Sequence, residues 1–268
     1  MHKKLPLGIF DSGFGGLSVA KSIHNLLPNE NLSYVADSAF TPYGDMEESD
    51  IVKRAILISD FLINKKECKV IVVACNTATA YAINILRDRF NVPIIGMEPA
   101  VKPALKVTLN NKVGVLSTSG TSKSAKFCAL LEKYSGDVKF FVQPCPGLVN
   151  AIEKGSFDEI ELFELLDKYL ANFKKNGVDT IVLGCTHFVY IKHLVKKIMG
   201  ENIMIVDTGE AVARQLKIKL EEFNLMENAS QPIEKMELIL TKYKNIPQIV
   251  NQFLSGSNIS FKLERSWD

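Results

Sequence analysis

Strand-like and helix-like patterns alternate along almost the whole chain, and this alternation constrains the fold more than any other feature of the sequence. A first series has strand patterns at residues 7–10, 32–37, 70–75 and 93–97, separated by helix patterns at 17–27, 50–64 and 77–90. A second series has strand patterns at 112–118, 138–143, 180–185 and 203–207, separated by helix patterns at 122–134, 160–175 and 190–199. This order predicts an α/β protein with mainly parallel sheets that helices cover on both faces.

Two such series predict two similar α/β domains rather than one very wide sheet. The 268 residues of the chain suit one large domain or two of ordinary size. We expect the chain to pass between the domains through short connections near Glu98 and Asp207. A helix pattern at 209–223, a strand pattern at 236–241 and a helix pattern around 246–254 complete the chain.

The composition indicates a globular protein with a substantial core, because 47% of the residues are hydrophobic and 23% are charged. Lysine plus arginine number 32 and aspartate plus glutamate number 30, and this balance argues against a nucleic-acid partner. The N-terminal apolar run is too short for a signal peptide, and no stretch approaches about 18 uninterrupted apolar residues, so no membrane segment is expected. The five cysteines include no CxxC pair, so we expect reduced thiols in a cytoplasmic protein and no metal site.

Two of the cysteines end strand patterns in the same way. Cys75 follows an apolar run in VVACNTATA (72–80), and Cys185 follows a similar run in VLGCTHFVY (182–190). Ligands bind beyond the carboxyl ends of strands in open parallel sheets, and the N–H groups at a strand-to-helix turn favour a thiolate. Polar residues follow both cysteines and would be costly to bury without partners. We therefore interpret Cys75 and Cys185 as functional, and Cys68, Cys128 and Cys145 as small packing residues.

Several loops bring further polar groups to strand ends. The loop FDSGFGG (10–16) places Asp11 and Ser12 after the first strand, and its glycines fit neither the GxGxxG fingerprint nor a Walker sequence. Asp37 ends the second strand, PYG (42–44) predicts a tight turn, and STSGT (117–121) offers hydroxyl and N–H groups. Glu153 lies in a region of weak pattern and, taken alone, is typical of a solvent-exposed acid.

Two thiols that face each other suit one chemistry in particular. To invert an α-carbon, a base must remove a proton from one face while an acid delivers a proton to the other face. Each reacting group must lie about 3–3.5 Å from the carbon, so that the two sulfur atoms would be roughly 7 Å apart. Strand ends from two facing domains would satisfy this requirement.

Five motifs in this order, FDSGFGGLSV, TPYG, VVACNTATA, VGVLSTSGT and VLGCTHF, strongly resemble the cofactor-independent Asp/Glu racemase family. The resemblance runs from about Leu7 to Asp207. It implies two α/β domains with the active site in the cleft between them, the first built from residues 1–97 and 208–268 and the second from residues 98–207. It also implies racemisation between L- and D-glutamate without a cofactor, which would supply D-glutamate for bacterial peptidoglycan.

The resemblance assigns roles to individual residues. The predicted catalytic residues are Cys75, Cys185, Asp11, His187, Asp37 and Glu153. The two cysteines match the acid/base pair, with Asp11 and His187 assisting them from opposite sides. Around Glu153 this chain reads CPGLVNAIE, where the family usually reads PLVE after its CP dipeptide. Positions that match substrate-binding residues are Asp11, Ser12, Pro42, Tyr43, Gly44, Cys75, Asn76, Thr77, Thr118, Thr121, Cys185, Thr186 and His187.

Other functions use some of the same features. Aspartate is the nearest alternative substrate, although the aspartate branch tends to carry Glu where this chain has His187. A non-catalytic amino-acid-binding protein would need the loops but not both thiols, and a pyridoxal-phosphate racemase would need a lysine at a strand end. Some relatives are associated with inhibition of DNA gyrase, which the near-neutral charge does not support. We expect a homodimer as one candidate assembly, and no regulation by a cell-wall precursor because the N-terminus is short.

Overall fold

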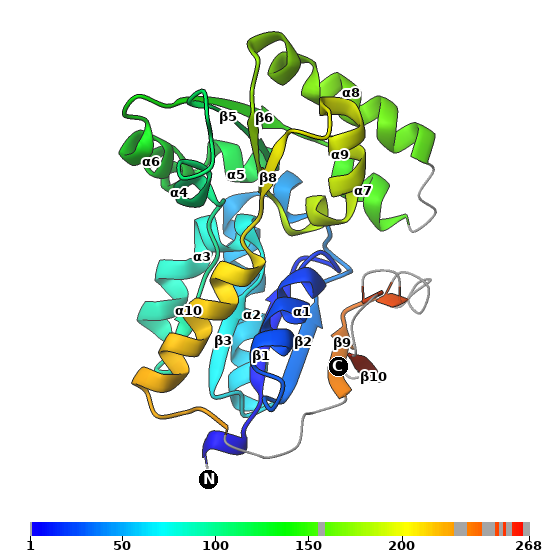
Figure 1. The fold of residues 1–268 in the computed structure, drawn as a ribbon. Helices are drawn as coiled ribbons and strands as arrows, with labels where there is room; N and C mark the ends of the chain where they lie inside the picture. Colours follow the sequence, from blue (N-terminus) through cyan, green and yellow to red (C-terminus); the bar gives the residue numbers. More distant parts are fainter. Residues whose placement is uncertain are drawn as a thin grey trace.

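The computed structural model describes residues 2–154, 159–227, 235–242, 250–251, 254–255 and 259–264. Its strands form one sheet of six and one sheet of four, and each sheet lies in its own lobe (Figure 1). We call the part around the six-stranded sheet lobe one and the part around the four-stranded sheet lobe two. The described strands pair in parallel throughout. The predicted α/β fold with two mainly parallel sheets is therefore confirmed.

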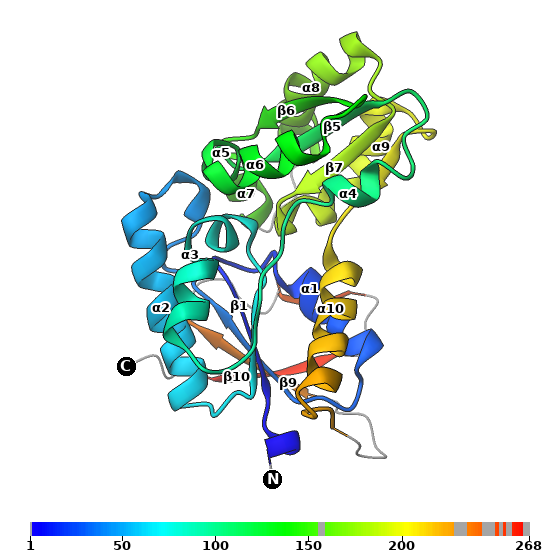
Figure 2. The same cartoon turned by 90° about the vertical axis from the view of Figure 1, so that its left-hand side faces the viewer.

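Lobe one has the strand order β10-β9-β2-β1-β3-β4. Its strands are β1 (Leu7–Asp11), β2 (Leu32–Ala36), β3 (Val70–Val73), β4 (Ile94–Ile95), β9 (Lys235–Leu240) and β10 (Ser260–Glu264). Helices α1 (Leu17–Leu26) and α10 (Gly209–Glu222) pack together on one face of the sheet, and α2 (Glu48–Asn64) and α3 (Asn76–Arg89) pack together on the other (Figure 2). Every residue of β1, β2 and β3 is buried, as expected for central strands covered on both faces.

Lobe two has the strand order β6-β5-β7-β8. Its strands are β5 (Lys112–Ser117), β6 (Lys139–Pro144), β7 (Thr180–Gly184) and β8 (Met204–Val206). Its helices are α4 (Val101–Ala104), α5 (Ser119–Lys123), α6 (Ala125–Tyr134), α7 (Leu148–Glu153), α8 (Glu159–Asn176) and α9 (Lys192–Met199). Helices α4 and α6 cover one face of the sheet, and α8 and α9 cover the other (Figure 1).

The two sheets share one topology. The segment β2-β1-β3-β4 of lobe one has the same order as β6-β5-β7-β8 of lobe two when the strands of each series are counted along the chain. In both sheets the first strand lies between the second and the third. A cysteine follows the third strand in each case: Cys185 comes directly after β7, and Cys75 comes one alanine after β3. This shared order agrees with the two similar α/β domains predicted from the sequence.

The structure differs from the sequence prediction in several elements. The predicted helix at 122–134 is two helices, α5 and α6, because the chain is extended at Ser124, whose hydroxyl instead accepts the N–H of Phe127 at 3.2 Å. The predicted helix at 190–199 begins as the 3-10 helix η3 (Thr186–Ile191) and becomes α-helical only at Lys192. Helix α7, strand β10 and two further 3-10 helices, η1 (His2–Lys4) and η2 (Tyr43–Asp45), were not predicted. The helix pattern around 246–254 lies largely outside the described residues.

Sheet membership is consistent with the predicted division into residues 1–97 plus 208–268 and residues 98–207, which stays a prediction. The strands of lobe one come from residues 7–95 and 235–264, and those of lobe two come from residues 112–206. Among the described helices, none combines the length and apolar character needed to cross a membrane.

A buried ion pair joins the loops at the amino-terminal end of the lobe one sheet. The ammonium of Lys69 lies 2.5 Å from the carboxylate of Glu30, and their side chains are only 1% and 2% exposed. Lys69 also donates to the carbonyl of Lys3, and the carboxylate of Glu30 accepts the N–H of Glu227 at 2.8 Å. The pair therefore connects the N-terminal segment, the turn before β2, the start of β3 and the segment after α10.

We expect Lys69→Met to lower the free energy of unfolding by about 3–5 kcal/mol, because the Glu30 carboxylate would stay buried without its cation. The control is Arg214→Met, which breaks the exposed pair of Arg214 with Glu210 and should cost below about 1 kcal/mol. Urea denaturation of both variants measures the difference. Equal costs for the two variants would contradict the importance given to the buried pair.

Candidate active site

Cys75 lies where β3 leads into α3, at the carboxyl end of the lobe one sheet. Its sulfur accepts the N–H of Ala78 at 3.4 Å and lies 4.0 Å from the hydroxyl of Ser12. The sequence predicted that this turn favours a thiolate, and the net effect is the opposite. Burial raises the pKa of the Cys75 thiol, the nearby Asp11 carboxylate raises it further, and the Ala78 N–H only partly offsets them. The surroundings therefore favour the neutral thiol of Cys75.

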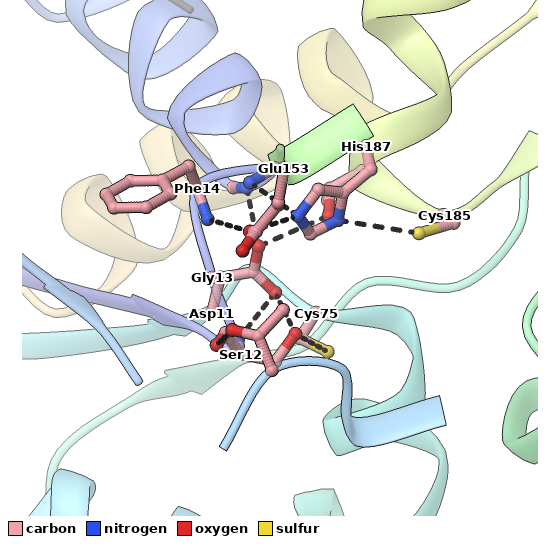
Figure 3. A network of polar contacts seen from close by, with 12 residues as sticks. Asp11, Ser12, Gly13, Phe14, Cys75, Glu153, Cys185 and His187 are labelled. Atoms are coloured by element: carbon pink, nitrogen blue, oxygen red, sulfur yellow. Dashed lines mark hydrogen bonds and ion pairs between the residues drawn. The ribbon is translucent and has the colours of Figure 1, made fainter. Parts of the chain in front are cut away.

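Cys185 lies where β7 leads into η3, at the equivalent place in lobe two. Its sulfur is 3.7 Å from Nδ1 of His187, and Nε2 of the same ring is 2.7 Å from the Glu153 carboxylate (Figure 3). Burial disfavours a charged imidazole, but hydrogen bonds to the Cys185 thiol and the Glu153 carboxylate outweigh it and raise the pKa of His187 well above its ordinary value. These contacts favour the charged form of the buried His187 ring, which faces the Cys185 sulfur on one side and the Glu153 carboxylate on the other, while the N–H of Gly15 lies 3.2 Å from Nε2.

Asp11 ends β1 and is fully buried. Its carboxylate accepts the N–H of Ser12 at 2.7 Å and that of Gly16 at 2.6 Å, so the loop after β1 wraps around the side chain. The hydroxyl of Thr186, from lobe two, donates to the same carboxylate at 3.3 Å. Burial raises the pKa of Asp11, while the charge on His187 and these hydrogen bonds pull it down. A carboxyl with a raised pKa beside Cys75 is suited to exchange a proton with that thiol.

Glu153 reaches from α7 of lobe two to the loop after β1 of lobe one. Its carboxylate accepts the N–H of Phe14 at 2.8 Å in addition to its contact with His187 (Figure 3). Two glycines make this approach possible, because a Cβ at Gly13 would overlap the Glu153 carboxylate and a Cβ at Gly15 would overlap the His187 ring. The assignment of Glu153 to the site, which its local pattern did not indicate, thus has a geometric basis.

Three threonine hydroxyls meet between the lobes. Thr77 of α3 lies 2.9 Å from Thr118 and 3.1 Å from Thr121, and the hydroxyls of Thr118 and Thr121 are 3.0 Å apart. Thr118 also caps α5 by accepting the N–H of Thr121. The hydroxyls of Thr118 and Thr121 are among the polar groups predicted for STSGT, and their contacts with Thr77 join the two lobes at a second place.

Asn76 follows Cys75 and is 4% exposed. Within the described part of the chain, neither atom of its side-chain amide has a hydrogen-bond partner. Because a buried amide without a partner is costly, this side chain is suited to bind a polar ligand.

In the same described ranges, no three His, Cys, Asp or Glu side chains gather as a metal site would require.

Asp37 contacts the turn at 42–44 and helix α2. Its carboxylate accepts the hydroxyl of Tyr43 at 2.6 Å and two nitrogen atoms of Arg54 at 2.7 and 2.8 Å. Arg54 was not predicted to belong to the site, because in the sequence it is one residue of a helix pattern. Its role as the partner of Asp37 becomes visible only when α2 packs against the sheet. Pro42 and Gly44 flank Tyr43 in the predicted turn, and Gly44 lies against Thr118.

The family model for the Asp/Glu/Hydantoin racemases matches residues 8–216, which contain all the site residues described above. The chain belongs to this family. It is 48% identical over 234 residues to the glutamate racemase of Ectopseudomonas mendocina, which covers 87% of this chain and 88% of that protein. It is 49% identical over 212 residues to the glutamate racemase of Pseudomonas aeruginosa strain PAO1, with 79% and 80% covered.

Solved racemases of the family share the whole fold. A glutamate racemase isoform of Bacillus anthracis superposes with a TM-score of 0.86 at 29% identity and covers 98% of both chains. The glutamate racemase of Francisella tularensis, solved with D-glutamate, gives a TM-score of 0.84 at 29% identity and covers 98% of this chain and 97% of that one. The Escherichia coli enzyme, solved with L-glutamate, gives 0.84 at 30% identity, with 96% and 97% covered.

The raised pKa of His187 makes the stability of the folded protein depend on pH. The ion pair with Glu153 contributes fully below the unfolded pKa of 6.5 and is lost as pH rises through the raised folded pKa. We therefore expect Glu153→Gln to be less stable than the wild type, by a margin that is largest below the ordinary histidine pKa of 6.5 and shrinks as the pH rises through the raised folded pKa of His187. Urea denaturation across this range measures the margin.

The control is Glu222→Gln, which removes the partner of Lys219 on the exposed face of α10. Since a lysine keeps its charge over this range, the margin for Glu222→Gln should stay constant. A Glu153→Gln margin that also stays constant would contradict a charged His187.

Proposed function

We propose that the protein interconverts L- and D-glutamate by passing the α-proton between the thiols of Cys75 and Cys185. The observation that carries this proposal is the presence of one cysteine at the equivalent strand end of each sheet, each with its own ionisable partner. Membership of the racemase family and the glutamate racemases that match most of the chain support the same reaction. The chemistry requires no group beyond these side chains.

On the lobe one side, Asp11 would activate Cys75. The thiol passes its proton to the Asp11 carboxylate, whose pKa is already raised by burial. The resulting thiolate then removes the α-proton from one face of the substrate. Desolvation, which keeps Cys75 protonated at rest, makes the thiolate a stronger base once it forms.

On the lobe two side, Cys185 would deliver its proton to the opposite face. This leaves a thiolate that the neighbouring His187 imidazolium stabilises, and Glu153 holds the ring charged and in place. In the reverse direction the Cys185 thiolate acts as the base and Cys75 as the acid. One proton leaves the α-carbon and one arrives, so turnover leaves the net charge of the site unchanged. The starting state returns when Asp11 releases the proton it took from Cys75 and the Cys185 thiolate takes one up from solvent.

The remaining predicted residues would bind the amino acid. The groups available are the hydroxyls of Ser12 and Thr186, the amide of Asn76, the threonines at 77, 118 and 121, and the turn at Pro42, Tyr43 and Gly44. The unpartnered amide of Asn76 supports a polar ligand beside Cys75.

As part of the proposal, the product D-glutamate would serve peptidoglycan synthesis in the cytoplasm, and the protein would be a homodimer.

Aspartate is the second candidate substrate. Its shorter side chain would leave one methylene of the site unfilled, which is worth only about 1–3 kcal/mol of discrimination. The relatives described above favour glutamate, because the proteins that are 48% and 49% identical over most of this chain are glutamate racemases. Polarimetry with each amino acid, without added cofactor, distinguishes the two.

We expect Cys75→Ala and Cys185→Ala each to abolish racemisation, because each face of the α-carbon needs its own group. The interpretation of Cys128 as a packing residue is wrong, because its thiol is exposed on α6. Cys128→Ala should therefore leave turnover within about two- to three-fold. Cys68→Ala tests a buried thiol outside the network and should act through stability alone. Substantial turnover by Cys75→Ala would overturn the two-base assignment.

Solvent labelling tests whether two bases act. A thiol holds a single proton, so the cysteine that takes the α-hydrogen from L-glutamate can return only that hydrogen, while the opposite cysteine carries deuterium from D2O. We therefore expect early D-glutamate to contain deuterium at the α-carbon and recovered L-glutamate to contain almost none. Mass spectrometry of the separated enantiomers at low conversion measures both. Deuterium entering L-glutamate as fast as product forms would indicate one base that serves both faces.

A further inference from the structure

Arg54 lies on α2 and holds the buried Asp37 with a two-pronged ion pair. Its Nε is 2.8 Å from one carboxylate oxygen and its Nη2 is 2.7 Å from the other. The guanidinium also stacks on the ring of Phe40 at 4.1 Å, and the two charged side chains are 15% and 0% exposed. This planar, two-point geometry is one that an arginine can make and a lysine cannot.

The position of Asp37 in turn fixes the position of the Tyr43 side chain. The phenol of Tyr43 donates to the same carboxylate at 2.6 Å, and the Tyr43 ring is fully buried. Tyr43 begins the short helix η2, which packs against α3 of lobe one and α5 of lobe two. The ion pair thus fixes the side chain that anchors the turn at 42–44.

The same turn touches both lobes close to the site. The hydroxyl of Thr41 donates to the carbonyl of Ser12, in the loop that wraps around Asp11. A Cβ at Gly44 would lie 2.6 Å from Cβ of Thr118, so the backbone of the turn approaches the threonine cluster closely. A displacement of Tyr43 would therefore shift the backbone that borders both the Ser12 loop and the threonines.

We propose that Arg54 is a positioning residue for the substrate-binding turn at 42–44, acting through Asp37 and Tyr43. This inference rests on the proposed function, in which that turn binds the amino acid. The acid/base groups of the proposed mechanism lie on other elements, at the ends of β1, β3 and β7, on η3 and on α7. Asp37, which the resemblance includes among the catalytic residues, has a positioning role in this inference. Loosening the turn therefore weakens binding of the ground state and the transition state alike, which raises KM and leaves kcat nearly unchanged.

The test variant is Arg54→Lys, which keeps the positive charge beside Asp37 and removes the fork and the stack on Phe40. We expect KM for both enantiomers of glutamate to rise by about five- to ten-fold, with kcat within about two-fold of the wild type. The control is Arg87→Lys on α3, whose guanidinium donates to the carbonyl of Ile94 at 3.2 Å and should leave KM unchanged. Initial rates in both directions by circular dichroism measure these values.

A double-variant cycle separates positioning from a purely structural role. If Arg54 acts through the phenol, Arg54→Lys introduced into a Tyr43→Phe background should raise KM by less than about two-fold more. A structural role would move thermal stability in both backgrounds and leave KM alone. Should Arg54→Lys fold poorly, the neutral pair Asp37→Asn with Arg54→Gln removes both charges together, and the same rise in KM is expected.

Three results would overturn the inference: an unchanged KM in Arg54→Lys and in the neutral pair, a fall in kcat at constant KM, or additive effects with Tyr43→Phe. The first and third remove the path through Tyr43, and the second would place Arg54 in the chemistry rather than in binding. A wild-type protein that does not racemise glutamate defeats the proposed function as well. That failure is recognised separately, since it appears before any substitution is made.

Discussion

Parallel strand pairing is the constraint on which the site depends. In each sheet it brings the carboxyl ends of all strands to one edge, and the strand-to-helix turns at that edge carry the polar side chains. Because both sheets use the same strand order, the first and third strands are neighbours in each, and Asp11 and Cys75 end up together in one lobe. The two edges face each other through contacts such as that of Thr186 with Asp11.

The charges at this junction differ in sign between the lobes. The lobe one thiol has a carboxyl group beside it, while the lobe two thiol has an imidazolium. Burial raises the pKa of both Cys75 and Asp11, whereas the hydrogen bond to Glu153 helps to raise that of His187. One topology therefore holds two acid/base groups in unlike electrostatic settings, and both settings bring a thiol within reach of proton transfer.

The sequence alone predicted most strands, the fold class and both thiols, because hydrophobic periodicity and the polar residues after each strand are local signals. The prediction failed where contacts between segments distant in the sequence determine the local structure. The ion pair of Arg54 with Asp37 requires α2 to lie against the sheet. The N–H of Ala78 does lower the pKa of Cys75, as the turn predicted, but burial and Asp11 outweigh it, and neither can be read from a turn motif. The break at Ser124 was missed because a capping hydroxyl competes with an otherwise continuous helix pattern. For Glu153, the family resemblance supplied what the local pattern did not.

Gly13 and Gly15 have a consequence for how such a protein can change over time. Their missing side chains make room for Glu153 and His187, and the bond from Phe14 to Glu153 joins positions 139 residues apart. Although the lobes repeat one topology, neither can therefore diverge without regard to the other. A chimera that combined lobe one of this chain with a lobe two shaped for a bulkier loop would leave a gap at the junction, and the reverse exchange would leave the lobes wedged apart. The glycines at positions 13 and 15 of one lobe are thus required by the side chains of Glu153 and His187 in the other.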